Sequence, residues 1–392
     1  MRRCLLAGLP TLAALTLAGG VTGATGSSSQ GQLSPQAQLG RLLFSDVRLS
    51  ASGQLSCSSC HDPANAYAAP NTAAVVMRGG VKLDQPGLRT VPSLRYLSET
   101  PRFTRHGYRD TGSEREDVGP AGGFMLDGRA DTLQEQALLP LFDPAEMANS
   151  SFAELAGRLR NAAYAPQFSR AFGAAPNART LIKQAVQALE RFELEDPSFH
   201  PYNSRFDRYL RGTQTLSTQE LSGLRLFVAP DKGNCAACHT IVTGRQGRAP
   251  DFTDYSYHAL GVPRNAAIPA NRDPHFFDLG LCGPRRTDLH AERQYCGYFK
   301  TPTLRNVARR RFFFHNGRFT NLRDVLHFYV ERDTDPRRWY PVRKFDDLPV
   351  SYRGNVNISD APLNRDSGAR SALNDAEIDD LIAFLQTLSD VD

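Results

Sequence analysis

The sequence predicts a mostly α-helical protein built from two homologous halves with long irregular connections. GRLLF at residues 40–44 precedes CSSCH at residues 57–61, and GLRLF at residues 223–227 precedes CAACH at residues 235–239. The same helix-then-CxxCH unit therefore occurs twice. Two further pairs follow in the same order: VPSLR at 91–95 with TPTLR at 301–305, and LDGR at 126–129 with HNGR at 315–318. Alternating strand patterns are scarce.

Helical spacing of apolar residues supports this fold class. It is found at Leu155, Leu159, Ile182, Ala185, Val186 and Leu189, at Leu322, Val325, Leu326 and Tyr329, and at Ile378, Leu381, Ile382, Leu385 and Leu388. Asn374 and Glu377 predict a capping box for the last helix. The span from residue 151 to 209 has the fewest motif residues. We expect it to link or brace the two halves, with the boundary near residues 212–217.

The first 26 residues have the layout of a cleaved secretory signal peptide. Arg2 and Arg3 precede an apolar stretch at residues 5–21, which ends in small residues at 22–24. The stretch is short for a membrane span, and no later window approaches the roughly 20 apolar residues that a span needs. The sequence thus predicts export to the periplasm with no transmembrane segment after cleavage. A retained anchor is the alternative, and Cys4 would leave with the signal.

Export places the mature chain where disulfides persist. Four of its six cysteines belong to the CxxCH motifs, and the other two, Cys282 and Cys296, are close in sequence. A local disulfide is the simplest interpretation, and two free thiols are the alternative. The net charge of +5 falls to about +3 without Arg2 and Arg3, which is too mild to indicate a nucleic-acid partner.

The CxxCH motifs predict two covalently bound haem c groups. Two thiols one helical turn apart can add to the two vinyl groups of one haem, and the adjacent imidazole then ligates the iron. Cys57, Cys60, Cys235 and Cys238 would form the thioethers, with His61 and His239 as proximal ligands. A four-cysteine zinc site or a redox-active CxxC would leave the histidines unexplained.

Methionine is the first residue type to consider as the sixth iron ligand of a c-type haem. The chain contains Met1, Met77, Met125 and Met147, so none follows the second CxxCH. A His/Met haem in that half would need a ligand from the other half. The sequence therefore disfavours a high-potential His/Met centre there.

Taken together, the motifs resemble the bacterial di-haem cytochrome c peroxidase and MauG family. The resemblance rests on the two CxxCH motifs, LDGR at 126–129 leading to Gln136, Pro140 and Glu146, and FKTPTLRN at 299–306 followed by HNG at 315–317. It implies two cytochrome c-like haem domains. We expect residues 27–212 to form the N-terminal domain with the peroxide-reacting haem, and residues 213–392 the C-terminal domain with the second haem.

The resemblance also implies site residues in the N-terminal domain. Glu146 and Gln136 fall at the spacing of the family's distal glutamate and glutamine, and Pro140 would shape the pocket. Peroxide cleavage needs a group that takes a proton from the near oxygen and returns it to the leaving oxygen, which a poorly solvated carboxylate can do. Without the resemblance, Glu146 is equally well explained as a carboxylate at a helix N-terminus.

Tyr329 stands where peroxidases of this family place a methionine ligand and MauG-type enzymes a tyrosine. An anionic phenolate stabilises oxidised iron, so a His/Tyr haem suits storage of an oxidising equivalent. Two alternatives are that Tyr329 is a packed core tyrosine and that His327 is the ligand instead.

Three departures from the family limit this comparison. Leu126 replaces a tryptophan common between the haems, and the single tryptophan, Trp339, lies elsewhere. Positions resembling the calcium ligands hold Thr90, Arg310 and Phe312, and a guanidinium there argues against bound Ca²⁺. No histidine follows His61 at the short distance of a removable sixth ligand. That suggests an N-terminal haem open at rest. The alternative is that His106, in the charged loop 105–119, swings in as a ligand.

We therefore expect an oxidoreductase of the cytochrome-c peroxidase type that reduces hydrogen peroxide at the N-terminal haem. Electrons would come from a small cytochrome c or a cupredoxin. One alternative is a MauG-like enzyme that oxidises side chains of a partner protein, and another is a non-enzymatic di-haem electron carrier.

Overall fold

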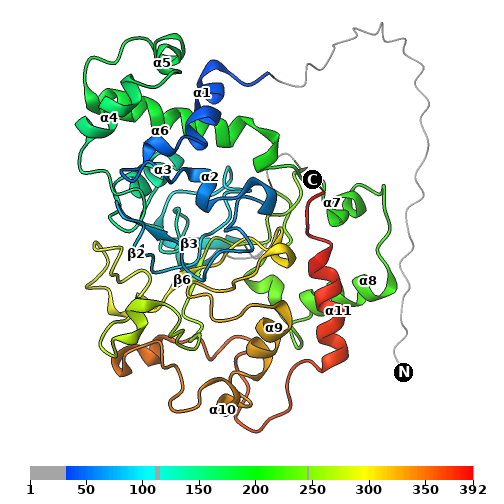
Figure 1. The fold of residues 1–392 in the computed structure, drawn as a ribbon. Helices are drawn as coiled ribbons and strands as arrows, with labels where there is room; N and C mark the ends of the chain where they lie inside the picture. The colour runs from blue at the N-terminus through cyan, green and yellow to red at the C-terminus, as the bar shows by residue number, and fades with distance from the viewer. Residues whose placement is uncertain (1–31, 111–114, 245–246, 392) are drawn as a thin grey trace, which may run out of the picture. The chain divides into compact units, whose positions relative to one another are not determined.

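Two pairs of crossing helices organise the chain (Figure 1). In the N-terminal half α1 (Pro35–Phe44) crosses α6 (Ala178–Glu195), and in the C-terminal half α8 (Thr218–Val228) crosses α11 (Asp375–Gln386). The structure is a computed structural model that describes residues 32–110, 115–244 and 247–391. The predicted signal peptide, residues 1–26, and Cys4 lie outside the described residues.

The remaining elements are short and joined by irregular chain, as predicted. The other helices are α2 (Cys57–Cys60), α3 (Leu133–Phe142), α4 (Phe152–Arg160), α5 (Ala165–Phe172), α7 (Arg205–Leu210), α9 (Leu322–Glu331) and α10 (Pro336–Trp339). Three two-stranded antiparallel sheets are formed by β1 (Arg78–Gly79) with β2 (Gln85–Pro86), β3 (Thr104–Asp110) with β4 (Arg115–Ala121), and β5 (Tyr257–His258) with β6 (Phe299–Lys300). Across the described ranges, every helix is too short or too polar to cross a membrane.

Each CxxCH begins with a tight helical turn that places its two thiols together. In α2, Ser56 and Ser59 form a capping box, and His61 N donates to Cys57 O over 2.8 Å. In the second motif a 3₁₀ turn at Cys235–Ala237 does the same, and His239 N donates to Cys235 O over 2.8 Å. The repeated sequence thus gives a repeated local geometry.

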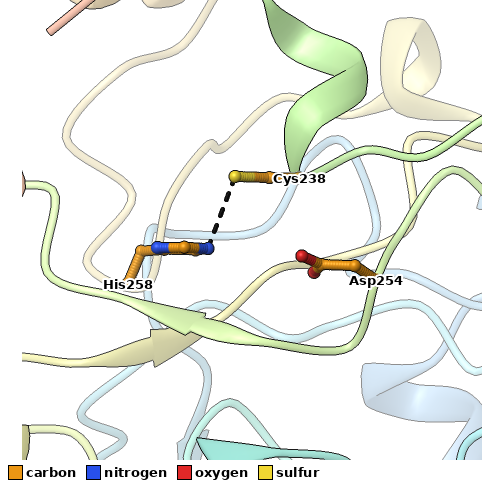
Figure 2. Close-up of side chains that lie close together, drawn as sticks. All are labelled: Cys238, Asp254 and His258. Carbon is orange, nitrogen blue, oxygen red and sulfur yellow. Dashed lines mark hydrogen bonds between the residues drawn. The ribbon is translucent and has the colours of Figure 1, made fainter. Parts of the chain in front are cut away.

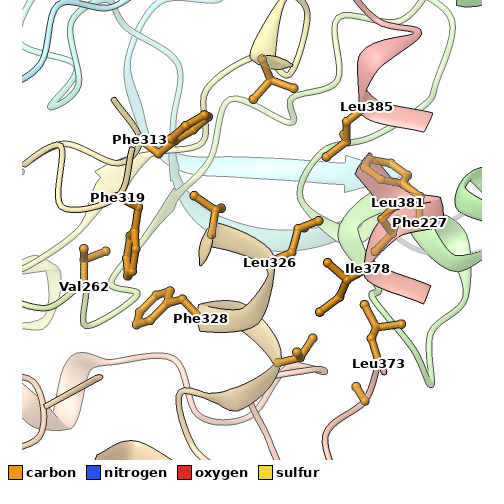
Figure 3. Packing of buried hydrophobic residues seen from close by; sticks show 14 of the residues in the cluster. Phe227, Val262, Phe313, Phe319, Leu326, Phe328, Leu373, Ile378, Leu381 and Leu385 are labelled. Atoms are coloured by element: carbon orange, nitrogen blue, oxygen red, sulfur yellow. The ribbon is translucent and has the colours of Figure 1, made fainter. Parts of the chain in front are cut away.

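Two hydrophobic cores lie one in each half. The first extends from Leu39 to Phe199, and the second from Phe206 to Leu388, where α9 and α11 face each other across it (Figure 3). Residues 151–209 were expected to link or brace the two halves, but α6, which lies in this span, packs mainly within the N-terminal half. This helix is the main partner of α1 and completes the first core. The division at residue 212 remains a prediction.

Two local predictions are confirmed. Asn374 caps α11 and forms a capping box with Glu377. Cys282 and Cys296 are joined by a disulfide. Both depend on residues close in sequence, which is why sequence spacing was sufficient to predict them.

The charged segment 105–119 was expected to be a loop, but its described residues, 105–110 and 115–119, belong to the paired strands β3 and β4. Tyr108 pairs with Asp117 in an antiparallel register, and irregular pairing separates Thr104 from Tyr108. Backbone hydrogen bonds can pair two exposed strands whatever their side chains are. Such strands need not show the alternation of apolar and polar residues by which a half-buried strand is recognised in a sequence.

The α1–α6 crossing depends on a glycine. A Cβ added at Gly40 would lie 2.0 Å from Ala188 O, and one added at Gly223 would lie 2.0 Å from Asp380 O in the equivalent α8–α11 crossing. Because the obstructing atoms are backbone, the helices would have to move apart. This close approach brings α6 and α11 to the sites described below.

We expect Gly40→Ala to lower the free energy of unfolding by about 1–3 kcal/mol or more, since the added methyl overpacks the crossing. Gly157 on α4 is the matched control, because no atom lies within 4 Å of its added Cβ. Gly157→Ala should raise stability by about 0.4–1 kcal/mol. Urea unfolding followed by circular dichroism measures both, and equal effects would contradict the predicted crossing.

Candidate functional site

Each CxxCH motif lines its own cavity. The N-terminal cavity, of about 170 Å³, is bordered by Cys57, Cys60 and His61. The C-terminal cavity, of about 240 Å³, is bordered by the second motif: Cys235, Cys238 and His239. Because the motifs line different cavities, their four thiols do not converge on one zinc site.

Both motif histidines are oriented as haem ligands would be. His61 Nδ1 donates to Tyr67 O over 3.1 Å, and His239 Nδ1 donates to Phe252 O over 3.0 Å, with Nδ1 assigned as the protonated nitrogen. Such a bond fixes the ring and leaves Nε2 for a metal. Burial lowers the pKa of His61 to about 4 and also lowers the pKa of His239. Both imidazoles are therefore neutral at neutral pH, the form that ligates iron.

The raised pKa values of the CxxCH thiols fit covalent attachment to haem better than they fit a redox-active or zinc-binding thiolate. Burial raises the pKa of Cys57 to about 12, of Cys60 to about 11 and of Cys235 to about 12. A redox-active CxxC or a zinc site needs a lowered thiol pKa. The residues present thus fit haem.

One group of side chains among the described residues could hold a metal ion by proximity: Cys238, Asp254 and His258, whose ligand atoms lie within 4.8 Å of one another (Figure 2). Cys238 Sγ lies 3.4 Å from His258 Nε2. Asp254 Oδ1 already accepts bonds from Ser256 N and Oγ at 2.9 and 2.7 Å. Cys238 and His258 line the C-terminal cavity, whereas Asp254 does not. Cys238 also belongs to the CxxCH motif, and a cysteine that formed a thioether to haem could not be a thiolate ligand of a metal ion.

The three predicted distal residues meet at the N-terminal cavity. Gln136 and Pro140 lie one turn apart on α3, and Glu146 lies in the turn that follows. Glu146 N donates to Asp143 O over 3.0 Å, and Glu146 O accepts from Gly80 N over 2.8 Å. These backbone bonds fix the position from which the carboxyl reaches the cavity.

The electrostatic surroundings of Glu146 suit proton transfer. Burial raises its pKa to about 7, the Asp143 carboxylate adds to the rise, and the Arg129 and Arg285 guanidiniums oppose it. Arg285 is ion-paired with Asp143, and no side chain in the described ranges hydrogen-bonds to the Glu146 carboxyl. A carboxyl with this pKa can both accept and donate a proton near neutral pH.

Tyr329 lies on α9 and lines the C-terminal cavity, whereas His327 does not. Burial raises the pKa of the Tyr329 phenol, and its hydroxyl has no hydrogen-bond partner among the described residues. His327 is directed elsewhere, with Nδ1 2.9 Å from Glu331 Oε1 and Nε2 3.5 Å from Asp375 Oδ1. Tyr329 is therefore the better placed of the two candidate ligands.

Thr90, Pro92 and Leu126 line both cavities. Leu126 O accepts from Lys300 N over 2.9 Å, so the residue that replaces the family's tryptophan lies between the two sites. Trp339 lies in the C-terminal core instead.

Arg310 lines the C-terminal cavity next to this junction. Its guanidinium donates to Val91 O over 3.4 Å and pairs with no carboxylate of the described chain. Thr90 Oγ1 donates to Phe314 O over 3.0 Å. Phe312 offers no side-chain oxygen, so these three residues do not make the oxygen-rich set that Ca²⁺ requires.

His106 does not fit the role of swing-in ligand. Its side chain is 66% exposed on the β3–β4 hairpin, and Nδ1 lies 2.8 Å from Asp117 Oδ2. It lines neither cavity. The pairing of β3 with β4 holds His106 at the surface. The sequence had predicted a loop here, from which the side chain could move.

Glu193 on α6 also lines the N-terminal cavity and was not predicted from the sequence. Helical spacing alone places it near the buried face of a helix and says nothing about a cavity. Aligning α6 with the equivalent helix of the second half would have singled it out.

Comparisons with known proteins agree with this geometry. The family model described as di-haem cytochrome c peroxidase matches residues 34–215. The methylamine utilization protein MauG of Paracoccus denitrificans is 32% identical over 363 residues, which cover 90% of this chain and 88% of the relative. The cytochrome c551 peroxidase of Nitrosomonas europaea is 28% identical over 298 residues, covering 74% and 71%.

Among solved structures, the di-haem peroxidase BthA from Burkholderia thailandensis matches with a TM-score of 0.81 and 41% identity, covering 91% of this chain and 86% of that chain. The mostly helical fold, the duplicated haem motif and these matches over most of the chain agree. The chain therefore belongs to the di-haem cytochrome c peroxidase and MauG family of haem-dependent oxidoreductases.

Proposed function

We propose that this chain is a periplasmic di-haem peroxidase that reduces hydrogen peroxide in the N-terminal cavity and passes oxidising equivalents to the C-terminal haem. One observation carries the proposal: Gln136, Pro140 and Glu146 line the same cavity as the first CxxCH, while Tyr329 lines the cavity of the second.

The haems would be held covalently. Cys57 and Cys60 would form the thioethers of the first haem with His61 as the iron ligand, and Cys235, Cys238 and His239 those of the second. Haem iron, when bound, supplies the electrons that break the peroxide O–O bond. The chain itself supplies attachment, orientation and protons.

Glu146 is the acid/base residue of this proposal. Its carboxylate takes the proton from the near oxygen of peroxide and returns it to the leaving oxygen, which leaves as water. Gln136, buried on α3, orients the peroxide through its side-chain amide, and Pro140 shapes the wall next to it.

Arg310 takes the place of a calcium ion in this proposal. Its guanidinium, which pairs with no carboxylate of the described residues, lines the C-terminal cavity, where a haem carboxylate would be a matching partner. The function requires no bound Ca²⁺.

The decisive experiment is to purify the chain from a host that exports and matures c-type cytochromes, and to add hydrogen peroxide with reduced cytochrome c or a reduced cupredoxin. We expect two covalent haems, one of them high-spin at rest, and donor oxidation in proportion to peroxide. Two low-spin haems inert to peroxide would leave only the electron carrier.

A MauG-like activity is the second candidate, because Tyr329 lines the C-terminal cavity and no methionine follows Cys238. A haem ligated by an anionic oxygen donor favours the oxidised state, which suits oxidation of a partner protein over reduction by a donor. Mass spectrometry of a candidate partner after peroxide addition tests this: side-chain oxidation supports it, and an unmodified partner with rapid donor oxidation supports the peroxidase.

The proposal predicts opposite pH shifts for two neighbouring variants. Because Asp143 raises the pKa of Glu146 and Arg285 lowers it, Asp143→Asn should move the rise of activity with pH to lower pH, and Arg285→Gln should move it to higher pH. The sign follows from Glu146 acting as a base only when ionised. Profiles of kcat against pH measure both shifts, and shifts in the same direction would contradict the assignment.

A further inference from the structure

Glu193 is a buried carboxyl that the proposed mechanism does not use. It lies in the last turn of α6, is 7% exposed, and lines the N-terminal cavity together with Cys57 and Leu189. Its carboxyl has no hydrogen-bond or ion-pair partner in the described parts of the chain, and Oε2 is fully buried. Burial of an unpartnered carboxyl destabilises a fold, so packing alone does not explain this residue.

The second half of the chain shows that an apolar residue suits this position. The α1–α6 and α8–α11 crossings can be aligned through their glycines. Gly40 approaches residues 188 and 192 of α6, and Gly223 approaches the equivalent residues 380 and 384 of α11. In the same register Glu193 matches Leu385, and Leu189 matches Leu381. Leu381 and Leu385 line the C-terminal cavity and lie in its apolar cluster (Figure 3). A carboxyl thus stands in one haem cavity where leucine stands in the other.

Within the described parts of the chain, no basic side chain forms an ion pair with the Glu193 carboxyl. α1 and α3 present only uncharged residues to the cavity: Phe44, Gln136, Ala137 and Pro140. Three titratable groups interact electrostatically with the Glu193 carboxyl: Glu190, Cys57 and Tyr67. The charged residues elsewhere on the wall are Glu146, Arg78, Arg89, Arg129 and Arg285. Burial and the Glu190 charge raise the pKa of Glu193 to about 8.

We propose that Glu193 couples a proton to the oxidation state of the N-terminal haem. The carboxyl holds a proton while the iron is reduced and releases it to solvent when the iron loses an electron, and the reverse occurs on reduction. Glu193 lines the same cavity as Cys57, which would hold the haem through a thioether, so its carboxyl would lie close to the attached haem. In a poorly polar cavity a carboxylate stabilises the added positive charge, and the coupling is reciprocal. This inference rests on haem attachment in the proposed function.

The test compares Glu193→Gln and Glu193→Leu with Glu190→Gln, a charge-matched control on the same helix that does not line the cavity. Glu190 accepts a bond from Gln134 Nε2 over 2.6 Å, which a glutamine oxygen can also accept. Spectroelectrochemistry gives the midpoint potential of the N-terminal haem between about pH 6 and pH 9. In the wild type the potential should fall with rising pH, because ionised Glu193 stabilises oxidised iron. In Glu190→Gln the fall should persist but begin at lower pH, because the Glu190 charge raises the pKa of Glu193. Both Glu193 variants should show a smaller fall, because Glu146 is then the carboxyl of the described cavity wall that still titrates in this range.

Redox difference infrared spectroscopy gives a second readout. Oxidation of the wild type should remove the carbonyl band of a neutral carboxylic acid, and Glu193→Gln should lack that change. The inference would be overturned if the midpoint potential of the N-terminal haem changed equally with pH in the wild type and in Glu193→Leu, with intact haem spectra in both. A chain without covalent haem would instead overturn the proposed function, so the two failures are distinguishable.

Discussion

Replacing Glu146 with glutamine is expected to lower kcat for hydrogen peroxide by about 10²- to 10⁴-fold, the usual contribution of a positioned acid/base group. Glutamine keeps the size of the side chain in the N-terminal cavity but cannot accept and return a proton. Stopped-flow assays with reduced donor measure the effect. The variant should also lose the rise of activity through about pH 7 that the raised Glu146 pKa predicts.

Glu135→Gln is the matched control for this change. Glu135 lies on α3 one residue from Gln136 but is exposed and does not line the cavity. Its turnover and pH profile should stay at the wild-type level. A Glu146→Gln enzyme with normal turnover would remove the acid/base assignment, whereas an equal loss in both variants would indicate a general effect on α3.

The second large effect is expected at Tyr329. Tyr329→Phe removes the phenol oxygen that we propose as sixth ligand, so the C-terminal haem should change from low-spin to high-spin and its reduction potential should rise. The ring packing against Phe314 and Phe328 should persist, because phenylalanine keeps the aromatic body. Electron paramagnetic resonance and redox titration of the purified protein measure both changes.

Two controls accompany Tyr329→Phe. Tyr209 packs against the same core without lining the cavity, so Tyr209→Phe should leave the spectrum unaltered. His327→Gln tests the alternative ligand. If His327→Gln and not Tyr329→Phe converts the haem to high-spin, the histidine is the ligand and the proposed His/Tyr centre is wrong.

The sequence predicted features that depend on neighbouring residues. The CxxCH turns, the Cys282–Cys296 disulfide and the Asn374 cap each require groups at fixed short spacing, and the repeat of the first motif indicated the two halves. The hairpin around His106 escaped prediction because exposed backbone pairing leaves little trace in residue type.

By itself, then, the sequence determined the fold class, the presence of haem cofactors and the duplication, because the motifs that indicate them are short and local. Only the tertiary structure decided which side chains share a cavity. It brought Glu146 to the first CxxCH and Tyr329 rather than His327 to the second, and it showed Glu193 to be a buried carboxyl with no hydrogen-bond partner in the described residues. These placements depend on how helices distant in sequence cross, and that is fixed by packing between their surfaces rather than by any short pattern.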